Sequence, residues 1–475
     1  LVLTDVNGND DGFVLASQAV LAPVGFSGTN FVLNSAGQKV ICAVNSASNT
    51  RPDCVPINLF GYGAPSAASL AFVNTEGRRE ERAEEFIVSL NVAGDLSQLF
   101  ELPGGPIGWS LGGEYREETA YSAWDELTAS GGTFLNAIQP FTPPKMTVKE
   151  VYGEVDLPLL KDMPFAKELT VRGAGRMSDY NTRTGTVWAW NVDGIWAPVS
   201  DLRFRAAFST SVRAPTQSDL YSTPSQNFSQ LTDPCDSSNI TANPSRAANC
   251  AAAGVPTVFN AATVTACAST AFTGTAGVSP WVNCTARTSS TGFLSGGNPT
   301  LVEERGKSLT LGMVIEPHWI PGLNLTIDWY RIKVTNLISA LSAQTIINLC
   351  YDSPTGINNP FCATVNRDAA TGLFVEPAVI SGGVNFAAQK TEGIDFDLSY
   401  RKTFANGQKL SLRAIATRVI KVDNYVDPTN PSLPNRQLGE LGDPLWAAGV
   451  TFNYDFGAVD FTYSARYIGK QTIGA

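Results

Sequence analysis

The chain has 475 residues, of which 43% are hydrophobic, 10% aromatic and 16% charged, and its formal net charge is −10. The acidic balance and the lack of a basic cluster exclude a typical nucleic-acid-binding protein, and the aromatic content excludes a disordered chain. The only histidine, His318, leaves little scope for histidine-based catalysis or a zinc site. No apolar run approaches the ~18 residues of a transmembrane helix.

The N-terminal stretch does not look like a targeting signal. Residues 1–11 lack the basic start and apolar core of a signal peptide. The segment from Asp5 to Asn9 opens like an EF-hand calcium loop, but Asp10 stands where that loop needs glycine, so no metal site is predicted. Because residues 467–475 stop just after a strand-like stretch, we expect the chain to be a mature or partial piece of a longer protein.

The eight cysteines fall into neighbouring pairs in polar, loop-like sequence. None forms a C-x-x-C motif, so metal binding and redox chemistry are disfavoured. An even number of such cysteines indicates disulfides in an oxidising compartment, although eight cysteines allow 105 connectivities and buried free thiols remain the alternative. We expect sequential neighbours to pair: Cys42 with Cys54, Cys235 with Cys250, Cys267 with Cys284, and Cys350 with Cys362.

Most of the readable chain alternates between apolar and polar residues with a period of two, which is typical of strands with one apolar face. The alternating segments are long, as a tilted transmembrane strand requires, and their apolar faces often end in Trp, Tyr or Phe, as in interfacial aromatic girdles. A soluble β-sandwich is the alternative. The clearest such segments are 169–178, 202–209, 323–330, 394–401, 450–455 and 461–467.

The predicted strands are connected by segments of two very different lengths. Asn406-Gly407 indicates a tight hairpin, whereas other connections are too long for a compact soluble domain. Outer-membrane barrels combine short turns on one side with long loops on the other. We therefore predict an all-β fold, a transmembrane antiparallel β-barrel, with long extracellular loops at about 118–148, 213–298 and 339–379.

Several short motifs occur in an order that resembles a known family. Each is weak alone, but together they span about residues 85 to 468, and the chain resembles the barrel of TonB-dependent outer-membrane receptors. Complete barrels of this kind have ~22 strands, so the resemblance implies that 1–475 is a partial barrel without the N-terminal plug domain and the last strands. The motifs are 102–108, 111–118, 201–205, 209–215, 219–221, 297–304, 321–323, 328–333 and 390–395.

The resemblance implies active uptake of a scarce nutrient, such as a siderophore–iron complex, cobalamin or an oligosaccharide, across the bacterial outer membrane. The implied partners are the chain's own plug domain, the TonB–ExbB–ExbD energising complex, outer-membrane lipids and lipopolysaccharide, and the small-molecule or oligosaccharide ligand. No nucleic acid, cofactor or catalytic residue is expected. The alternatives are a passive porin-like barrel and a secreted β-rich adhesin or polysaccharide-active protein.

Two groups of residues are candidates for contact with the transported ligand. Charges on the wet strand faces fit a polar lumen, with simple ion pairing as the alternative: Arg172, Arg176, Arg203, Arg205, Asp328, Asp395, Asp397 and Arg413. Aromatic residues in the outer loops are candidates for stacking on a ligand, although such residues more often pack loops or form the aromatic girdle: Tyr121, Trp124, Phe134, Phe228 and Trp281. His318 is expected to be structural.

Overall fold

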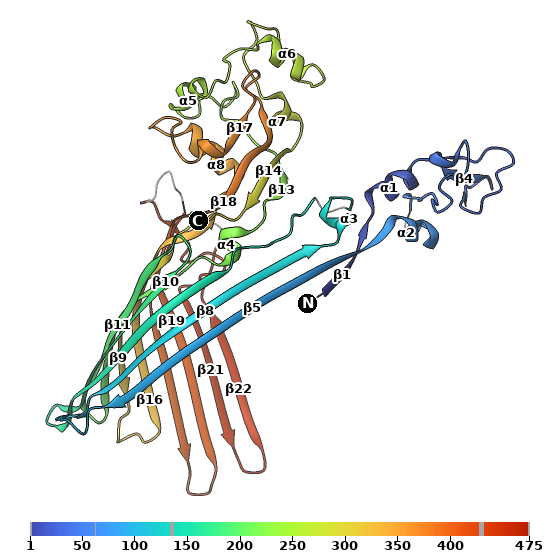
Figure 1. Ribbon diagram of the computed structural model, residues 1–475. Helices are drawn as coiled ribbons and strands as arrows, with labels where there is room; N and C mark the ends of the chain where they lie inside the picture. Colours follow the sequence, from blue (N-terminus) through green and yellow to red (C-terminus); the bar gives the residue numbers. More distant parts are fainter. Residues whose placement is uncertain (1, 62, 134–136, 427–431, 474–475) are drawn as a thin grey trace.

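The computed structural model describes residues 2–61, 63–133, 137–426 and 432–473 (Figure 1). It consists mainly of antiparallel strands with few helices, which confirms the predicted all-β class. In these residues no helix is long and apolar enough to cross a membrane. The long strands are β5 (Asn74–Asp95), β8 (Gly108–Trp124), β9 (Met146–Met163), β10 (Ala166–Tyr180), β11 (Thr186–Val199), β12 (Leu202–Arg213), β15 (Glu304–Ile315), β16 (Leu323–Ala340), β18 (Phe374–Thr403), β19 (Lys409–Tyr425), β21 (Trp446–Asp455) and β22 (Asp460–Ile468).

The remaining elements are short and lie mostly in the connections. The helices are α1 (Asp10–Ser17), α2 (Ala67–Val73), α3 (Glu126–Ala129), α4 (Gln217–Tyr221), α5 (Arg246–Ala252), α6 (Ala261–Cys267), α7 (Cys284–Thr288) and α8 (Ala343–Tyr351), with 3-10 turns η1 (Ala43–Asn45) and η2 (Cys362–Thr364). The short strands are β1 (Val2–Gly8), β2 (Ala19–Leu21), β3 (Val32–Leu33), β4 (Lys39–Cys42), β6 (Glu101–Leu102), β7 (Gly105–Pro106), β13 (Ser225–Ser229), β14 (Thr291–Gly296), β17 (Val365–Arg367) and β20 (Asn435–Arg436).

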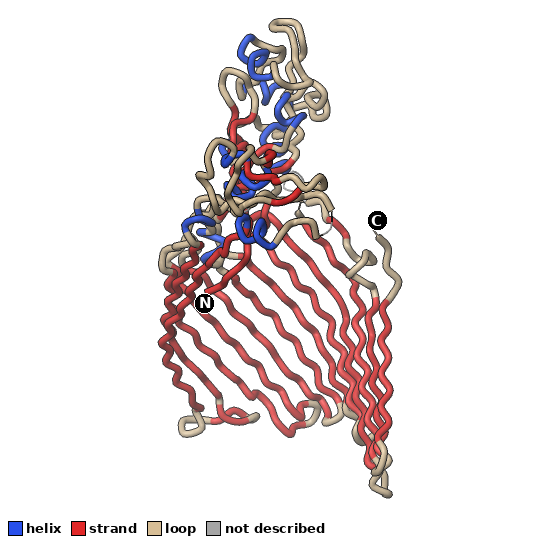
Figure 2. Tube along the Cα trace, turned by 90° about the vertical axis from the view of Figure 1, so that its right-hand side faces the viewer, coloured by secondary structure: helices blue, strands red, loops and turns tan. Residues whose placement is uncertain are grey.

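Each long strand pairs antiparallel with the next long strand along the chain, and together they form one curved sheet, here called the barrel wall. Figure 2 shows the wall with helices and long connections at one end and short turns at the other. In the short turn after β18, the Phe404 N–H donates to the Gln408 carbonyl at 2.9 Å. Gly407 has φ +82°, a conformation that glycine adopts without strain.

The two faces of the wall differ in chemistry. One face is apolar and exposed along the middle of the strands; Leu90, for example, is 72% exposed. A soluble protein rarely exposes a continuous apolar surface of this size, whereas a lipid-facing band has this character. The other face is polar and lines the concave lumen. Exposed members of the apolar face include Phe86, Val88, Leu111, Val151, Val155, Trp188, Trp190, Val192, Trp196, Phe208 and Leu311.

A segment of the chain between β1 and β5 stands apart from the wall at the end that carries the long connections (Figure 1). It contains α1, α2 and the small sheet β2-β4-β3. The Cys42–Cys54 disulfide joins the end of β4 to the following loop. Both of these cysteines are fully buried, so the bridge lies in the interior of this small unit.

Two long connections fold together above the wall into one unit, here called the outer cap (residues 222–296 and 341–381). The core of the cap draws apolar side chains from both segments, including Phe259 and Trp281 from the first and Ile347 and Val379 from the second. Strand β14 also pairs in parallel with the first part of β18, with Leu294 opposite Ile380. The two segments therefore share a single hydrophobic core.

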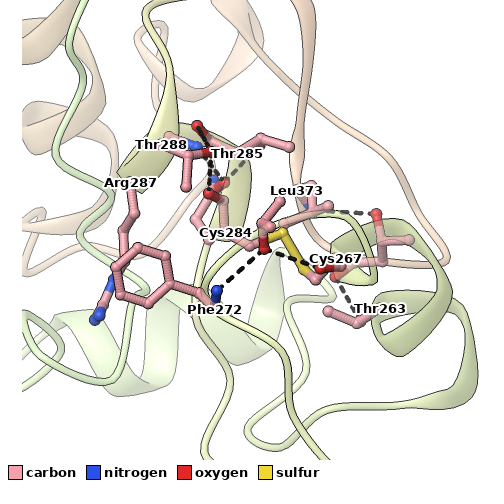
Figure 3. The surroundings of a disulfide bond; sticks show 12 residues. Thr263, Cys267, Phe272, Cys284, Thr285, Arg287, Thr288 and Leu373 are labelled. Carbon is pink, nitrogen blue, oxygen red and sulfur yellow. Dashed lines mark hydrogen bonds between the residues drawn. A yellow bond between two sulfur atoms is a disulfide. The ribbon is translucent and has the colours of Figure 1, made fainter.

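Three disulfides fasten the cap, each within one of its segments: Cys235–Cys250, Cys267–Cys284 and Cys350–Cys362. Figure 3 shows Cys267–Cys284 with Leu373 of the second segment beside it. In the chain-entropy view, closing a loop of this size contributes about 3 kcal/mol by restricting the unfolded chain. All eight cysteines of the chain are joined to their sequential neighbours.

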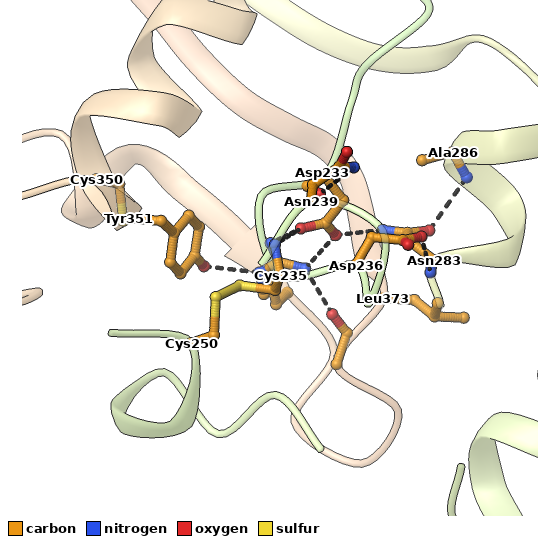
Figure 4. A network of polar contacts seen from close by, with 12 residues as sticks. Asp233, Cys235, Asp236, Asn239, Cys250, Asn283, Ala286, Cys350, Tyr351 and Leu373 are labelled. Atoms are coloured by element: carbon orange, nitrogen blue, oxygen red, sulfur yellow. Dashed lines mark hydrogen bonds and ion pairs between the residues drawn. A yellow bond between two sulfur atoms is a disulfide. The ribbon is translucent and has the colours of Figure 1, made fainter. Parts of the chain in front are cut away.

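A buried ion pair connects the two cap segments. The Arg367 guanidinium donates to both Asp233 carboxylate oxygens at 2.7 Å, and the two side chains are 6% and 1% exposed. Arg367 also donates to the Tyr351 hydroxyl at 2.7 Å. Burial alone would lower the pKa of Arg367, but the Asp233 carboxylate outweighs burial and raises it, so the guanidinium remains charged. Figure 4 shows Asp233 among its polar neighbours, including Asn283.

A second buried carboxylate, Asp236, stabilises the neighbouring turn of the cap. Burial alone would raise the pKa of Asp236, but hydrogen bonds from Arg287, Ser238 and the Asn283 backbone outweigh it and lower the pKa. A third pair, Arg246 and Asp352, again joins the two segments, with Nη2 to Oδ2 at 3.0 Å. The polar groups inside the cap thus act between segments far apart in the sequence.

We predict that reducing agents will open the cap before they affect the wall. Cys362 is only half-buried while the other cysteines are buried, so Cys350–Cys362 should be reduced first. Limited proteolysis with mass mapping should then show new cleavage in 341–381. The far-ultraviolet strand signal should stay unchanged, because the wall is held by backbone hydrogen bonds. A collapse of that strand signal on reduction would contradict this division.

We also predict that Arg367→Met will destabilise the cap by about 3–5 kcal/mol, because it leaves the Asp233 carboxylate buried without a counter-charge. Hydrogen exchange of the 341–381 amides measures the effect. Arg51→Met, which removes a pair that is about half exposed and lies outside the cap, is the control and should leave the exchange of these amides unchanged, because solvent screens that pair. Adding Asp233→Asn to Arg367→Met should restore part of the loss; equal effects of the two arginine substitutions would refute this role.

Candidate functional site

The polar face of the wall forms a hollow in the lumen. Apolar and polar residues alternate along β9 to β12, so the polar side chains point to one side. The register places Arg172 on β10 directly opposite Asp156 on β9 and Asp193 on β11. The hollow has a volume of about 830 Å³. Its polar lining includes Tyr152, Glu154, Arg172, Arg176, Asn191, Asp193 and Arg205.

The charged side chains predicted for the lumen lie on this face, and ion pairs or hydrogen bonds hold them. The Arg205 guanidinium donates to both carboxylate oxygens of Asp328. Most of the arginines are about half exposed, so solvent screens these pairs and each contributes little to stability. The other contacts are Arg172–Asp156 at 3.5 Å, Arg176–Glu150 at 3.3 Å, Arg203–Glu168 at 3.3 Å, Arg413–Asp397 at 2.9 Å, and Thr417 to Asp395 at 2.6 Å.

One glycine allows an aromatic ring to lie flat against the lumen wall. Gly112 on β8 is opposite Tyr152 on β9, and a Cβ on Gly112 would come within 2.4 Å of the Tyr152 ring. The Arg176 guanidinium also lies over this ring, 4.8 Å from its centroid. Any larger residue at position 112 would force the Tyr152 ring to move.

The segment that follows β12 fastens the rim of the wall below the cap. Arg213 contacts Asp219 at 3.0 Å and Glu304 at 2.8 Å. Helix α4 starts with a capping box in which the side chains of Thr216 and Asp219 each accept the other's backbone N–H. The Gln217 amide donates to the carbonyls of Glu118 and Pro144, both at 3.1 Å. These contacts give Arg213, the first residue of the Arg213-Ala214-Pro215 motif, a structural role at the rim.

The structure spreads the aromatic residues predicted for ligand contact over several environments. Trp281 is 1% exposed, and its indole N–H donates to the Thr371 carbonyl at 2.9 Å. It packs the cap core and offers no ring face to a ligand. Phe228 on β13 is 52% exposed. Phe134 lies outside the described residues.

The two aromatic residues on β8 lie near its end, at the rim of the wall. Tyr121 shares a strand face with Tyr115 and Glu117, the side opposite the lumen, and is partly exposed. Trp124 is the last residue of β8 and lies on the lumen side, where the Arg79 guanidinium is 5.7 Å from its ring centroid. Neither residue contacts Phe228 or Trp281 in the contacts that the structure gives, so no single aromatic cluster forms.

Helix α3 begins beside Trp124 and fixes the turn that follows β8. Asp125 accepts hydrogen bonds from the backbone N–H groups of Thr128 and Arg78. Burial would raise the pKa of Asp125, but these hydrogen bonds outweigh it and lower the pKa. This carboxylate stays ionised, and it caps α3 at the rim of the lumen.

Sequence reasoning missed the residues that hold the cap and the rim together. Asp233 and Arg367 are 134 positions apart, and Gln217 reaches carbonyls that are 99 and 73 positions away. Nothing in their local sequence marks them as partners. The one local hint is that Asp233 lies two residues before Cys235. A disulfide at Cys235 indicates that the surrounding loop is ordered, so a charged side chain beside it needs a partner.

The remaining polar groups offer little chemistry in the described part of the chain. No group of three or more His, Cys, Asp or Glu side chains there could hold a metal ion. His318 lies at the end with the short turns, and its Nδ1 is 2.5 Å from Asp201. This contact lowers the pKa of Asp201. With the imidazole largely exposed, it is a surface contact that links two turns.

Solved structures similar to this chain include siderophore receptors. The siderophore receptor PirA from Pseudomonas aeruginosa matches with 13% identity, 83% coverage of this chain, 52% coverage of that chain and a TM-score of 0.43. The siderophore receptor PirA from Acinetobacter baumannii matches with 14% identity, 84% coverage of this chain, 44% coverage of that chain and a TM-score of 0.45. For a mutant of the ferric enterobactin receptor PfeA from Pseudomonas aeruginosa, the identity is 12%, the coverage is 84% of this chain and 42% of that chain, and the TM-score is 0.45. The chain spans about half the length of these proteins.

The amino-acid sequence itself supplies the family assignment. No curated protein matches the chain significantly. Residues 55–474, however, match the family described as TonB dependent receptor-like, beta-barrel. The members of this family lie in the outer membrane of Gram-negative bacteria, which agrees with the exposed apolar face of the wall and its polar lumen. The chain belongs to the TonB-dependent receptor family, as part of its β-barrel.

Proposed function

We propose that the chain forms the wall and outer cap of an energy-coupled transporter that takes up a scarce nutrient. The observation that carries this proposal is the polar, ion-paired lumen beneath an ordered, disulfide-fastened cap. The nutrient is of the class too large or too dilute for passive diffusion, such as a siderophore–iron complex, cobalamin or an oligosaccharide. The proposed partners are a plug domain that fills the lumen and the TonB–ExbB–ExbD complex that acts on the plug.

The physical properties of the lumen favour a polar occupant. Arginines and carboxylates pair across neighbouring strands on the lumen face. Such a surface can pair with the polar surface of a plug or with a hydrophilic ligand, whereas an apolar ligand would leave these groups unsatisfied. The same surface is unsuited to a lipid or a hydrophobic drug.

The cap is the proposed capture surface for the ligand. Its core and disulfides keep its exposed side chains in place, so that binding costs little ordering entropy. Phe228, on the strand pair β13–β14 near the base of the cap, is the exposed aromatic side chain best placed for stacking. Trp124 on the lumen side of the rim is a second candidate, and Tyr121 a weaker one because it faces away from the lumen.

A passive porin is the other function that this wall could serve, and energy dependence separates the two. We predict that cells carrying the complete native protein will accumulate the nutrient against its gradient, and that a protonophore will abolish this uptake. Labelled ferric siderophores, cobalamin and oligosaccharides would be tested in parallel, with cells lacking the gene as the control. Uptake that survives the protonophore and only equilibrates the nutrient would refute active transport in favour of passive diffusion.

Removing the Phe228 ring should weaken ligand binding without harming the cap. An aromatic contact contributes about 0.5–1.5 kcal/mol, so Phe228→Ala should raise the Kd of the transported nutrient by roughly threefold to tenfold. Val278→Ala, another exposed apolar residue of the cap, is the matched control and should leave the Kd unchanged. Equal Kd values for all three proteins, measured by calorimetry, would remove Phe228 from the binding surface.

A further inference from the structure

The outer cap has very little unpaired charge. It contains no lysine and no histidine. Its arginines all form ion pairs with aspartates of the cap: Arg246–Asp352, Arg287–Asp236 and Arg367–Asp233. Beyond these pairs only two carboxylates remain, those of Asp368 and Glu376. The cap, which the structure describes in full, therefore offers no cationic side chain without a carboxylate partner, and its net charge is negative.

The exposed surface of the cap is rich in hydroxyl groups. In segment 222–296 every exposed polar residue is Ser, Thr or Gln, such as Thr241, Thr257 and Ser289, and no exposed residue carries a charge. Hydroxyl groups both donate and accept hydrogen bonds. An anionic ligand, in contrast, would meet an excess of like charge on the cap, which disfavours its binding. The chemistry of this surface therefore favours an uncharged ligand that carries many hydroxyl groups.

One small sheet of the cap has an exposed face. This sheet, here called the cap sheet, consists of β13, β14 and the adjoining part of β18, residues 374–382 (Figure 1). Phe293 and Val379 pack in or against the cap core, so their side of the sheet is buried. On the other side, Phe228 is 52% exposed and Ile380 is 49% exposed. The cap sheet thus presents an aromatic ring and apolar neighbours to water.

A carboxylate lies beside the exposed Phe228 ring. Phe228 on β13 is directly opposite Gly292 on β14, and residues in such positions point to the same side with Cβ atoms about 4.5–5.5 Å apart. A Cβ on Gly292 would lie 2.7 Å from Oε2 of Glu376. The Glu376 carboxylate therefore takes the place that a side chain at position 292 would fill, next to Phe228 on the exposed side of the sheet.

The protein uses one oxygen of this carboxylate and leaves the other free. Oε1 of Glu376 accepts from the Gly292 backbone N–H at 3.0 Å. Within the part of the chain that the structure describes, no hydrogen bond or ion pair engages Oε2, and Glu376 is exposed. A carboxylate oxygen is a strong acceptor for a hydroxyl donor. An exposed aromatic ring beside a free acceptor matches a sugar, which has an apolar face of C–H groups and hydroxyls at its edge.

We propose that the exposed side of the cap sheet binds a neutral oligosaccharide. One sugar ring would stack on Phe228, and its hydroxyls would donate to Oε2 of Glu376. The absence of a free cation on the cap favours an uncharged sugar chain over an anionic ligand, such as an oligosaccharide of uronic acids or a ferric tris-catecholate. This inference rests on the proposed uptake function and names the class of its ligand.

The test compares four versions of the complete, detergent-purified native protein: the unchanged protein, Glu376→Gln, Gly292→Ala and Asp368→Asn. Glu376→Gln keeps an acceptor for the Gly292 N–H but removes the charge, whereas Gly292→Ala keeps the charge and displaces the carboxylate. Asp368→Asn is the matched control, because it removes the charge of a cap carboxylate that accepts from Thr371. An array of neutral and acidic glycans and a ferric tris-catecholate are the probes, calorimetry gives the Kd, and limited proteolysis checks that the cap is folded.

We expect the unchanged protein to bind a neutral oligosaccharide in preference to the acidic glycans and the ferric tris-catecholate. Glu376→Gln and Gly292→Ala should each raise the Kd about fivefold, since a charged acceptor is lost or displaced. Asp368→Asn should leave the Kd unchanged. Binding of anionic probes alone, no binding of any neutral oligosaccharide, or one Kd shared by all four proteins would overturn the site.

Uptake measurements separate a failure of this inference from a failure of the proposed function. Cells that accumulate a ferric tris-catecholate or cobalamin against its gradient, with a protein that binds no neutral oligosaccharide, would keep active transport and reject the sugar site. A neutral oligosaccharide that binds through Glu376 but only equilibrates across the membrane, with or without a protonophore, would keep the sugar site and reject active transport.

Discussion

The requirement that every backbone N–H and C=O be satisfied in hydrocarbon governs this protein. Inside a bilayer an unpaired backbone group has no water molecule with which to form a hydrogen bond. Each long strand therefore pairs with its neighbours along its membrane-spanning part. Because successive side chains point to opposite faces, the same pairing produces one face for lipid and one for water. The polar lumen and the apolar band are both consequences of that alternation.

The outer cap solves a different problem from the wall. A sheet alone does not hold long connections in water. Other interactions must offset the conformational entropy that the connections lose when they become ordered. The cap does so by building a core from two distant connections, and the charged pair of Asp233 and Arg367 lies inside that core. A buried pair of this kind adds little net stability, but it strongly disfavours any arrangement in which one partner is buried alone. It thereby specifies how the two connections fit together.

The sequence predicted the wall better than it predicted the candidate site. The period-two pattern is local, so segments such as 169–178 and 323–330 reveal both their strand character and their wet face without knowledge of the fold. The lumen positions of Arg205 and Asp328 follow directly from it. Contacts in the cap depend instead on side chains more than a hundred positions apart, for which a single sequence holds no signal. Trp281 illustrates the limit. Its residue type suits ligand stacking, but its indole donates to the Thr371 carbonyl and its ring packs in the cap core.

The shared core of the cap has a consequence for how such receptors diversify. Neither of its two connections can keep its shape if the other is replaced, because Asn249 and Trp281 of the first satisfy backbone carbonyls of the second. A recombination event that exchanged only one connection would expose half of the core to water and leave its polar groups without their hydrogen-bond partners. Changes of specificity that keep the barrel therefore have to proceed by small substitutions on the cap surface, or by the joint inheritance of both connections as a single module.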